Sequence, residues 1–582
     1  MTGTFISQRT GSGCRRHGVI VLLASALSLC TTILHAQGGA AQVTAGSCAV
    51  SGRLLNQVTN GPIEGASVTL IDPSQAAFDL ADASYALFSA RPKPASPDLK
   101  AESINDGTFC FHTVKAGTYV VTATKTGFLD SGYGAQSYLQ TGTIVAVGGT
   151  PVRGISMTLQ PMSGIDGQIV DDHGETVANA NVVAVRQLWY QGRQVFMPVQ
   201  GSQSNERGEY RIGKLTPGTY FVYARPVPFG QRPTSVAHVN GQMVRTYHPS
   251  ALSLTNATAV SVPSGEDVHG IDIRAIKTNT YHVRGRIDGS KGQWVGGSVE
   301  LLPAEEEQMI IVFGAGNLSP EGEFDFPDIT PGSYRLIFQS AAGASKMQVE
   351  VKDSDKVVNV PAIENGTIRG KVAVDASTGT ESIPIPKITL IPADAIIGLT
   401  YQIDVDSNGG IRADGIRPGK YLLKIAMPSG EFVKSITAGT SELNSRELDL
   451  TAGGNVELTI VVSDRSAALG GTVTKAAQSS GVRPADVVLI ASPARIDGSG
   501  LYLGTTDSNG QFLIKNLPPG KYKVCALPSI DVRLFQNPGL FKRMADMGTE
   551  VELQEKGNTF LELPPIYSGM LDQLLGSASV LQ

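Results

Sequence analysis

The stretch NGQFLIKNLPPGKY, residues 509–522, sets two glycine turns on either side of a short apolar run and ends on Tyr522. Gly510 precedes Tyr522 by 12 residues, and this spacing occurs at four other places in the chain. A spacing that recurs at intervals of about 100 residues marks a repeated structural unit. The other glycine and tyrosine pairs are Gly107 and Tyr119, Gly208 and Tyr220, Gly322 and Tyr334, and Gly409 and Tyr421.

The two turns of each unit differ in chemistry. Asn-Gly or Asp-Gly forms the first turn in three units and supplies the positive φ of a tight hairpin, whereas the second and third units have Arg207 and Glu321 before the glycine. Pro-Gly forms the second turn in four units, with Ala116 in place of proline in the first. Pro-Gly predicts a type II turn, because proline presets φ and the following glycine accepts a positive φ.

The residues around the turns predict strands. Apolar side chains alternate after each tyrosine, as in Tyr522, Val524 and Ala526, which is the period of a half-buried strand. The tyrosines share this inward face with Val and Leu, so core packing is favoured over a sugar-stacking stripe. Each unit also opens with a glycine and an aliphatic residue two positions later: Gly52 and Leu54, Gly167 and Ile169, Gly285 and Ile287, Gly370 and Val372, and Gly471 and Val473.

About seven short strands per ~100 residues predict an all-β chain, a tandem array of about five seven-stranded Ig-like or transthyretin-like β-sandwich domains. We call the units repeats 1 to 5. Repeat 1 has an Ala, Ser and Pro-rich insertion at 73–100, and repeat 3 a long loop at 303–314. The predicted bounds are 45–160, 161–279, 280–364, 365–465 and 466–566, followed by a tail or short docking helix at 567–582.

The order of these motifs resembles a known family. Gly-x-aliphatic, then Gly65-Ala66-Ser67-Val68, Asp-Gly-x-Phe and Pro-Gly-x-Tyr are similar to the carboxypeptidase regulatory-like domain, a relative of transthyretin-like and Cna B-type surface repeats. The resemblance covers residues 45 to 565. It implies a seven-stranded β-sandwich that serves as a stalk or accessory module on exported bacterial proteins and is described as carbohydrate-binding-like.

The N-terminus predicts export. Three arginines, Arg9, Arg15 and Arg16, precede an apolar run from Val19 to Leu29, and Ala36 suits a signal peptidase cleavage site. The alternative, a membrane anchor, is disfavoured because the run is shorter than the ~20 residues of a spanning helix. We therefore expect residues 1–36 to be a signal peptide and the mature protein to be periplasmic, at the cell surface or secreted, with no later membrane span.

The net charge limits the kinds of partner that the protein can bind, and the cysteines bear on whether it is exported to an oxidising compartment. The formal charge of -5 becomes -8 without the three leader arginines, and no basic run remains, which argues against nucleic-acid binding. Cys14 and Cys30 lie in the leader. Cys48 and Cys110 in repeat 1 could close a disulfide after export, while Cys525 stands alone. Three small buried apolar residues are an equally good interpretation of these cysteines.

No pattern indicates catalysis, a metal or a cofactor. His-x-x-Glu, His-Glu-x-x-His, Gly-x-Ser-x-Gly and phosphate-loop motifs are missing. Asp404-x-Asp406-x-Asn408-Gly409 begins like a calcium loop, but Gly415 stands where a bidentate Glu is needed, so a hairpin turn is favoured. Lys371 could start a Cna B-type isopeptide bond, yet other opening strands lack the lysine and a solvent-facing side chain is expected.

Four aromatic residues are the candidate ligand contacts. Trp189 and Tyr190, and more weakly Trp294 and Tyr133, are expected in loops, where flat rings can stack on sugars. The alternative is that these rings cover small cores of their own loops. We therefore expect a non-catalytic structural or adhesive scaffold of the envelope or exterior, with a carbohydrate-binding protein as the alternative and a glycan or cell-surface protein as partner.

Overall fold

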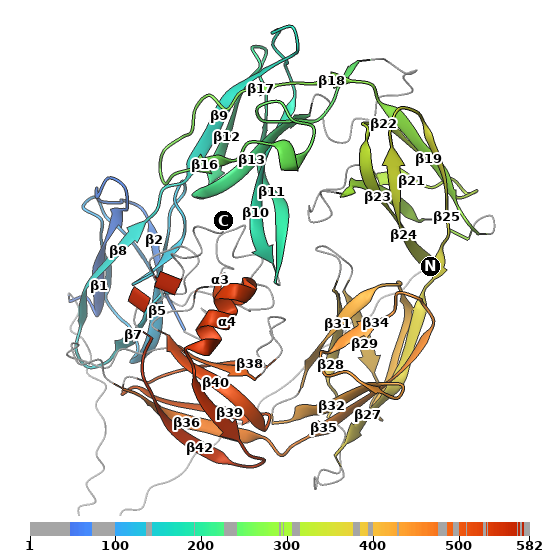
Figure 1. Ribbon diagram of the computed structural model, residues 1–582. Helices are drawn as coiled ribbons and strands as arrows, with labels where there is room; N and C mark the ends of the chain where they lie inside the picture. The colour runs from blue at the N-terminus through green and yellow to red at the C-terminus, as the bar shows by residue number, and fades with distance from the viewer. Residues whose placement is uncertain are drawn as a thin grey trace, which may run out of the picture. The chain divides into compact units, whose positions relative to one another are not determined.

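The computed structural model describes residues 47–72, 99–135, 142–190, 192–225, 241–289, 293–294, 296–304, 315–375, 384–393, 400–427, 430–474, 486–492, 500–507, 509–527, 531, 533–566, 569–570 and 573–574. Strands dominate throughout, which confirms the all-β prediction (Figure 1). The predicted signal peptide, most of the repeat 1 insertion and repeat 3 loop, and most of the tail lie outside these residues. Among them, no helix is both long and apolar enough to cross a bilayer.

Repeat 1 shows the basic plan, drawn in blue in Figure 1. One sheet has the order β4-β1-β8, and the other has β3-β2-β5-β6, with β7 also paired to β5. Its buried side chains, from Val50 to Leu159, form one core between the sheets. The strands are β1 (Val50–Asn56), β2 (Ser67–Ile71), β3 (Leu99–Glu102), β4 (Thr108–Phe111), β5 (Gly117–Thr124), β6 (Ser131–Gly132), β7 (Ile144–Val147) and β8 (Val152–Leu159).

Repeat 2 follows the same plan, with sheets β12-β9-β17 and β11-β10-β13-β15, to which β16 adds beside β13. A separate two-stranded sheet joins β14 and β18. The elements are β9 (Ser163–Val170), β10 (Asn181–Tyr190), β11 (Arg193–Gln203), β12 (Glu209–Leu215), β13 (Gly218–Arg225), β14 (Gln242–Met243), β15 (Thr246–Tyr247), the 3-10 helix η1 (Leu254–Asn256), β16 (Val260–Val262), β17 (Ile273–Arg274) and β18 (Lys277–Thr278).

Repeat 3 has sheets β22-β19-β25 and β21-β20-β23-β24-β26. Trp294 and Phe338 both lie in its core. The strands are β19 (Tyr281–Ile287), β20 (Ser298–Pro303), β21 (Ala315–Asn317), β22 (Glu323–Ile329), β23 (Gly332–Gln339), β24 (Gly343–Val351), β25 (Lys356–Val360) and β26 (Ile363–Glu364).

Repeat 4 joins its two layers into one nine-stranded sheet, in the order β33-β32-β35-β27-β30-β29-β28-β31-β34. Strand β29 causes this, because its first half pairs with β28 and its last two residues pair with β30. The strands are β27 (Gly366–Val374), β28 (Lys387–Pro392), β29 (Tyr401–Val405), β30 (Gly410–Ile416), β31 (Lys420–Ala426), β32 (Phe432–Ala438), β33 (Ser441–Glu442), β34 (Glu447–Asp449) and β35 (Asn455–Ser463).

Repeat 5 has sheets β39-β36-β42 and β38-β37-β40-β41 and adds two helices that the sequence did not predict. Asn537 caps the longer helix by accepting bonds from the Gly539 and Leu540 amides, and Pro538 follows at its first position. The helices cover Val488 and Cys525 of the second sheet. The elements are β36 (Ala467–Val473), β37 (Asp486–Ala491), β38 (Leu501–Thr505), β39 (Gln511–Leu517), β40 (Gly520–Leu527), α3 (Arg533–Gln536), α4 (Pro538–Asp546), β41 (Thr549–Leu553) and β42 (Asn558–Leu563).

The opening glycine allows the first strand of each repeat to pair in parallel with a strand near the end of that repeat. In repeat 5, Gly471 lies opposite Leu561 of β42, and a Cβ on Gly471 would come within 2.1 Å of the Leu561 carbonyl oxygen. The opening glycines of the other repeats lie against a carbonyl oxygen in the same way, at 1.8 to 2.3 Å from the position of a Cβ. The parallel pairs are β1 with β8, β9 with β17, β19 with β25, β27 with β35 and β36 with β42.

The first turn differs from the predicted hairpin. Its glycine has positive φ in every repeat, but the residue before it does not. In repeat 5 the Gly510 amide donates to the Asp507 carbonyl oxygen at 3.0 Å, and the Asp507 carboxylate accepts from the Asn509 and Gln511 amides. This is a type I turn with a left-handed glycine, which favours Asp, Asn or Ser at its first position. In repeats 1, 2, 3 and 5 it leads from one sheet to the other, and only in repeat 4 are its flanking strands, β29 and β30, paired.

The predicted type II turn at Pro-Gly is wrong. Gly332 and Gly419 do not have positive φ, and the φ of Gly218, 150°, and of Gly520, 146°, lies far from the ~+80° of a type II turn. Instead, the left-handed residue stands six positions before the tyrosine, where the preceding strand bulges: Lys214, Asp328, Gly415 and Asn516. A bulge with a left-handed residue twists the strand at its end, so the chain turns there before the Pro-Gly pair.

Candidate functional site

The recurring tyrosine anchors the turn that precedes it. Its phenolic oxygen donates to the backbone carbonyl oxygen four residues earlier in every repeat: Tyr119 to Lys115 at 3.1 Å, Tyr220 to Thr216 at 2.5 Å, Tyr334 to Thr330 at 2.8 Å, Tyr421 to Arg417 at 2.7 Å and Tyr522 to Pro518 at 2.6 Å. Four of the rings are buried, and Tyr119 is half-buried. This tyrosine corner is a structural device of β-sandwiches. Burial raises the pKa of Tyr522 well above its usual range, so the phenol remains a donor.

Trp294 is a core residue, which corrects its prediction as a loop ligand contact. Its side chain is 4% exposed and meets Phe338 edge to face, with ring centroids 5.3 Å apart. The indole nitrogen donates to the Asp288 carbonyl oxygen at 3.0 Å. Because the side chain is buried and its polar atom is engaged, Trp294 cannot stack on a sugar.

The other aromatic candidates also differ from loop platforms. Trp189 and Tyr190 end strand β10, where they pair with Gln194 and Arg193 of β11. Trp189 is half-buried, and only the backbone of Tyr190 is described. Tyr133 lies in a turn, half-buried against the repeat 1 core. The structure therefore brings none of these residues together in one site.

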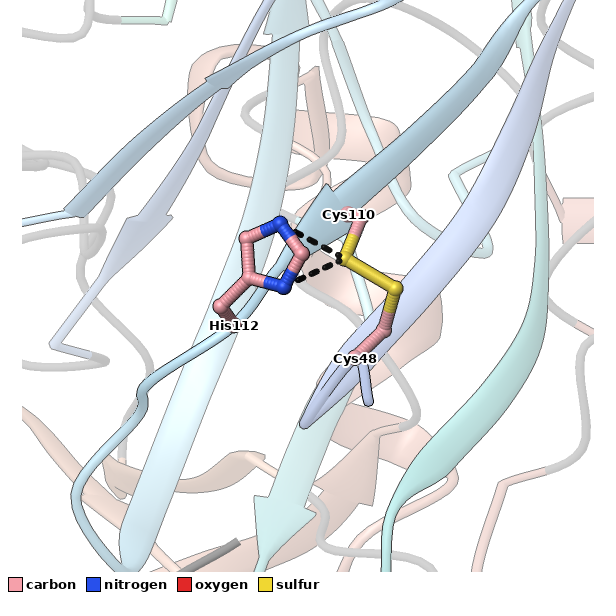
Figure 2. Close-up of a disulfide and its surroundings, with 3 residues drawn as sticks. All are labelled: Cys48, Cys110 and His112. Carbon is pink, nitrogen blue, oxygen red and sulfur yellow. Dashed lines mark hydrogen bonds between the residues drawn. A yellow bond between two sulfur atoms is a disulfide. The ribbon is translucent and has the colours of Figure 1, made fainter. Parts of the chain in front are cut away.

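Cys48 and Cys110 are joined by a disulfide, with their Cα atoms 5.4 Å apart (Figure 2). The bridge ties the residues just before β1 to the neighbouring strand β4. Both cysteines are half-buried, and the exposed His112 lies beside them with each ring nitrogen 3.6 Å from the Cys110 sulfur. Cys525 is a buried thiol that donates to the Met544 carbonyl oxygen at 3.4 Å, and burial raises its pKa to about 12.

Two groups of described side chains have the composition of a metal site. In the first group, Cys48 and Cys110 form the disulfide, so their sulfur atoms are not available as thiolate ligands. In the second, Lys277 lies on the acidic pair, with its nitrogen 3.0 Å from Asp171 and 2.6 Å from Asp172. The Lys277 ammonium lowers the pKa of Asp171 to about 2, helped by bonds from the Glu175 and His173 amides. The Lys277 ammonium therefore occupies the position beside Asp171 and Asp172 that a metal cation would need.

The calcium-like segment and Lys371 behave as the sequence predicts. The Asp406 carboxylate accepts from the Asn408 and Gly410 amides, so it closes the turn. Lys371 is exposed.

The outer face of the three-stranded sheet is charged in repeats 2 and 3 but apolar in repeat 5. Charged side chains occupy the same register position in repeats 2 and 3. Arg211 lies opposite Asp166 and pairs with Asp267, and Arg284 lies opposite Asp325 and pairs with it. In repeat 5, Gly470 lies between Leu513 and Phe560 at this position. Leu513 is 55% exposed and Phe560 75%. The Phe560 ring extends over Gly470, where a Cβ would meet its Cε1 atom at 2.6 Å. The sequence did not predict this apolar row, because Leu513 and Phe560 lie on two different strands and the candidate aromatic contacts were expected in loops.

Comparisons with known proteins return only distant structures. No family model matches the chain, and no curated protein matches it. The chain is similar to the Bacillus anthracis TIE protein, at 12% identity and TM-score 0.15, over 69% of this chain and 73% of that one. It is also similar to GBS52, the minor pilin of Streptococcus agalactiae, at 16% identity and TM-score 0.21, over 39% and 95%.

A third similar structure is BcpA, the major pilin subunit of Bacillus cereus, at 11% identity and TM-score 0.14, over 69% of this chain and 99% of that one. TM-scores this low carry no conclusion about what this chain does. The resemblance to the carboxypeptidase regulatory-like domain stays a prediction.

Proposed function

We propose that this chain is an exported, non-catalytic scaffold that carries tension along its length and presents sheet faces for adhesion. One observation carries the proposal: in every repeat the first strand pairs directly, and in parallel, with a strand near the end of the repeat, which is the last strand in repeats 1, 4 and 5 and the last but one in repeats 2 and 3. The two ends of a repeat then leave at opposite ends of this strand pair. Tension along the chain loads the hydrogen bonds of the pair together, in shear, whereas a hairpin opens one bond at a time.

Five separate domains suit this role, with the bounds 45–160, 161–279, 280–364, 365–465 and 466–566. The main core clusters of the described residues support this division, since each draws its members from one repeat. The leader pattern at 1–36 supports export to the periplasm, the cell surface or the medium.

The use of polar groups supports a scaffold. The phenols of the five tyrosines and the carboxylates of the turns bond to backbone atoms. These groups hold the architecture. The exposed row of Leu513 and Phe560 is our candidate for the adhesive contact, in place of the loop aromatics.

Single-molecule stretching of the chain, held by its two ends, tests the proposal. We expect five unfolding events at forces well above those that peel a hairpin. Gly370→Ala places a Cβ 1.8 Å from the Leu458 carbonyl oxygen and should lower the force of one event only. Gly148→Ala, where no atom lies within 4 Å, is the matched control. Unfolding at hairpin-like forces, or a Gly370→Ala chain that resists as the parent does, would refute the tension-bearing role.

A further inference from the structure

The disulfide of repeat 1 has two chemically different ends. His112 lies beside the Cys110 sulfur, with both ring nitrogens 3.6 Å away (Figure 2). In Figure 2 the Cys48 sulfur lies beyond that of Cys110 as seen from the ring. The bridge is half-buried and its histidine is exposed, so a small thiol can approach from solvent.

Thiol exchange at a disulfide is sensitive to this difference. The attacking thiolate bonds to one sulfur and expels the other as a thiolate, and the sulfur whose thiolate is better stabilised leaves faster. A neighbouring imidazolium stabilises a thiolate electrostatically. Here the imidazole of His112 lies next to the Cys110 sulfur.

From this geometry we propose that Cys48 is a site of reversible modification by small thiols such as glutathione, with Cys110 as the leaving sulfur and His112 as its positioning and charge partner. The thiolate of the small molecule forms a bond to the Cys48 sulfur. The electron pair of the broken S–S bond stays on Cys110, which becomes a thiolate beside His112. A second small thiol can then attack the mixed disulfide, releasing the Cys48 thiolate and a small-molecule disulfide.

The modification has a structural consequence inside repeat 1. The bridge holds the start of β1 to β4, where Val50 pairs with Phe111 and Ser51 with Cys110. Opening it leaves these backbone pairs as the ties at this end of the sheet. The third described cysteine does not compete, because Cys525 is buried and its raised pKa keeps it a thiol.

Mass spectrometry of the folded, full chain tests the assignment. The protein is treated briefly with glutathione, the exchange is stopped by adding excess iodoacetamide at neutral pH, which alkylates free thiolates, and the labelled cysteines are mapped by peptide. We expect glutathione on Cys48 and the alkyl group on Cys110, by about tenfold or more. Equal labelling of the two cysteines, or glutathione mainly on Cys110, would overturn the proposal.

Variants of His112 show whether its side chain, and not only the solvent exposure of the disulfide, sets the rate and the site of exchange. His112→Ala should slow opening about tenfold and bring the two adducts toward equal yield, and His112→Lys should restore both rate and preference. His173→Ala, an exposed histidine in repeat 2, is the matched control and should change neither. If His112→Ala keeps the parent rate and the parent adduct, the histidine has no part in the exchange.

Discussion

The phenolic oxygen of Tyr522 lies 2.6 Å from the carbonyl oxygen of Pro518 and donates a hydrogen bond to it. The ring is 3% exposed and packs in the core of repeat 5. One side chain therefore fills the core and ties down the turn from which its strand begins. The same bond in the other four repeats explains why the residue is tyrosine, since phenylalanine would pack but could not donate.

Tyr522→Phe should destabilise the local structure of β40 by about 1 kcal/mol, the usual net value of a buried hydrogen bond. Hydrogen exchange of the β40 amides, followed by mass spectrometry, measures the change. Tyr119→Phe is the control, because that ring is half-buried and its bond is longer, at 3.1 Å. An equal effect at both sites would mean that the buried bond is not the source of the stability.

Gly471→Ala should destabilise repeat 5 by about 3 kcal/mol, at the upper end of what overpacking costs. Its Cβ would lie 2.1 Å from the Leu561 carbonyl oxygen, and a backbone atom in a paired strand cannot move aside cheaply. Urea unfolding gives the free energy. Gly149→Ala, in open space, should leave the curve unchanged. A Gly471→Ala protein as stable as the parent would contradict the close approach of β36 and β42.

Acid should weaken the contact between Lys277 and the end of β9. The folded-state pKa of Asp171, about 2, lies below the ordinary 3.8, so its contribution is present above about pH 4 and is lost as the pH falls toward 2. Hydrogen exchange of residues 165–177 between pH 2 and 5, corrected for intrinsic rates, follows the loss. Lys277→Met should lower protection at pH 5 and flatten this dependence. Lys542→Met, an exposed helix lysine, should leave it intact.

Reduction should lengthen one unfolding step in the stretching experiment. The disulfide excludes the chain between Cys48 and Cys110, a separation of 62 residues, from extension. At about 3.5 Å per residue, opening the bridge adds roughly 22 nm to the extension of repeat 1. Comparison of step lengths with and without a thiol reductant measures it, and the other four steps serve as internal controls. Identical steps in both conditions would show that the bridge is not formed in the folded protein.

Phe560→Ser should reduce retention of the protein on its surface partner without lowering its stability, because the ring is 75% exposed. Binding to cell-wall fractions and to insoluble polysaccharides, measured as depletion from solution, gives the readout, and a melting curve checks the fold. Val357→Ser is the matched control, since Val357 is 74% exposed at the corresponding position of β25. Retention that survives Phe560→Ser would remove this row as the adhesive contact.

The sequence by itself determined the repeat. The 12-residue spacing from turn glycine to tyrosine and the alternating strand after it are local signals, because turn conformation and strand period depend on neighbouring residues. The first turn glycine has the positive φ that the sequence predicts in every repeat, and the tyrosine lies at the start of its strand with its ring against the core. The type of each turn was harder to predict, since the left-handed residue at Asn516 belongs to a bulge that exists only when β39 pairs with β36.

Tertiary structure alone decided which side chains meet. The opening glycine is required because the carbonyl of a strand about 90 residues later lies against it, as Leu561 does at Gly471. Trp294 lies in the turn between β19 and β20, as expected, yet its ring is buried in the core, where it packs edge to face with Phe338 of β23. The disulfide and the exposure of Phe560 likewise depend on pairing between strands far apart in the chain, which local sequence patterns do not encode.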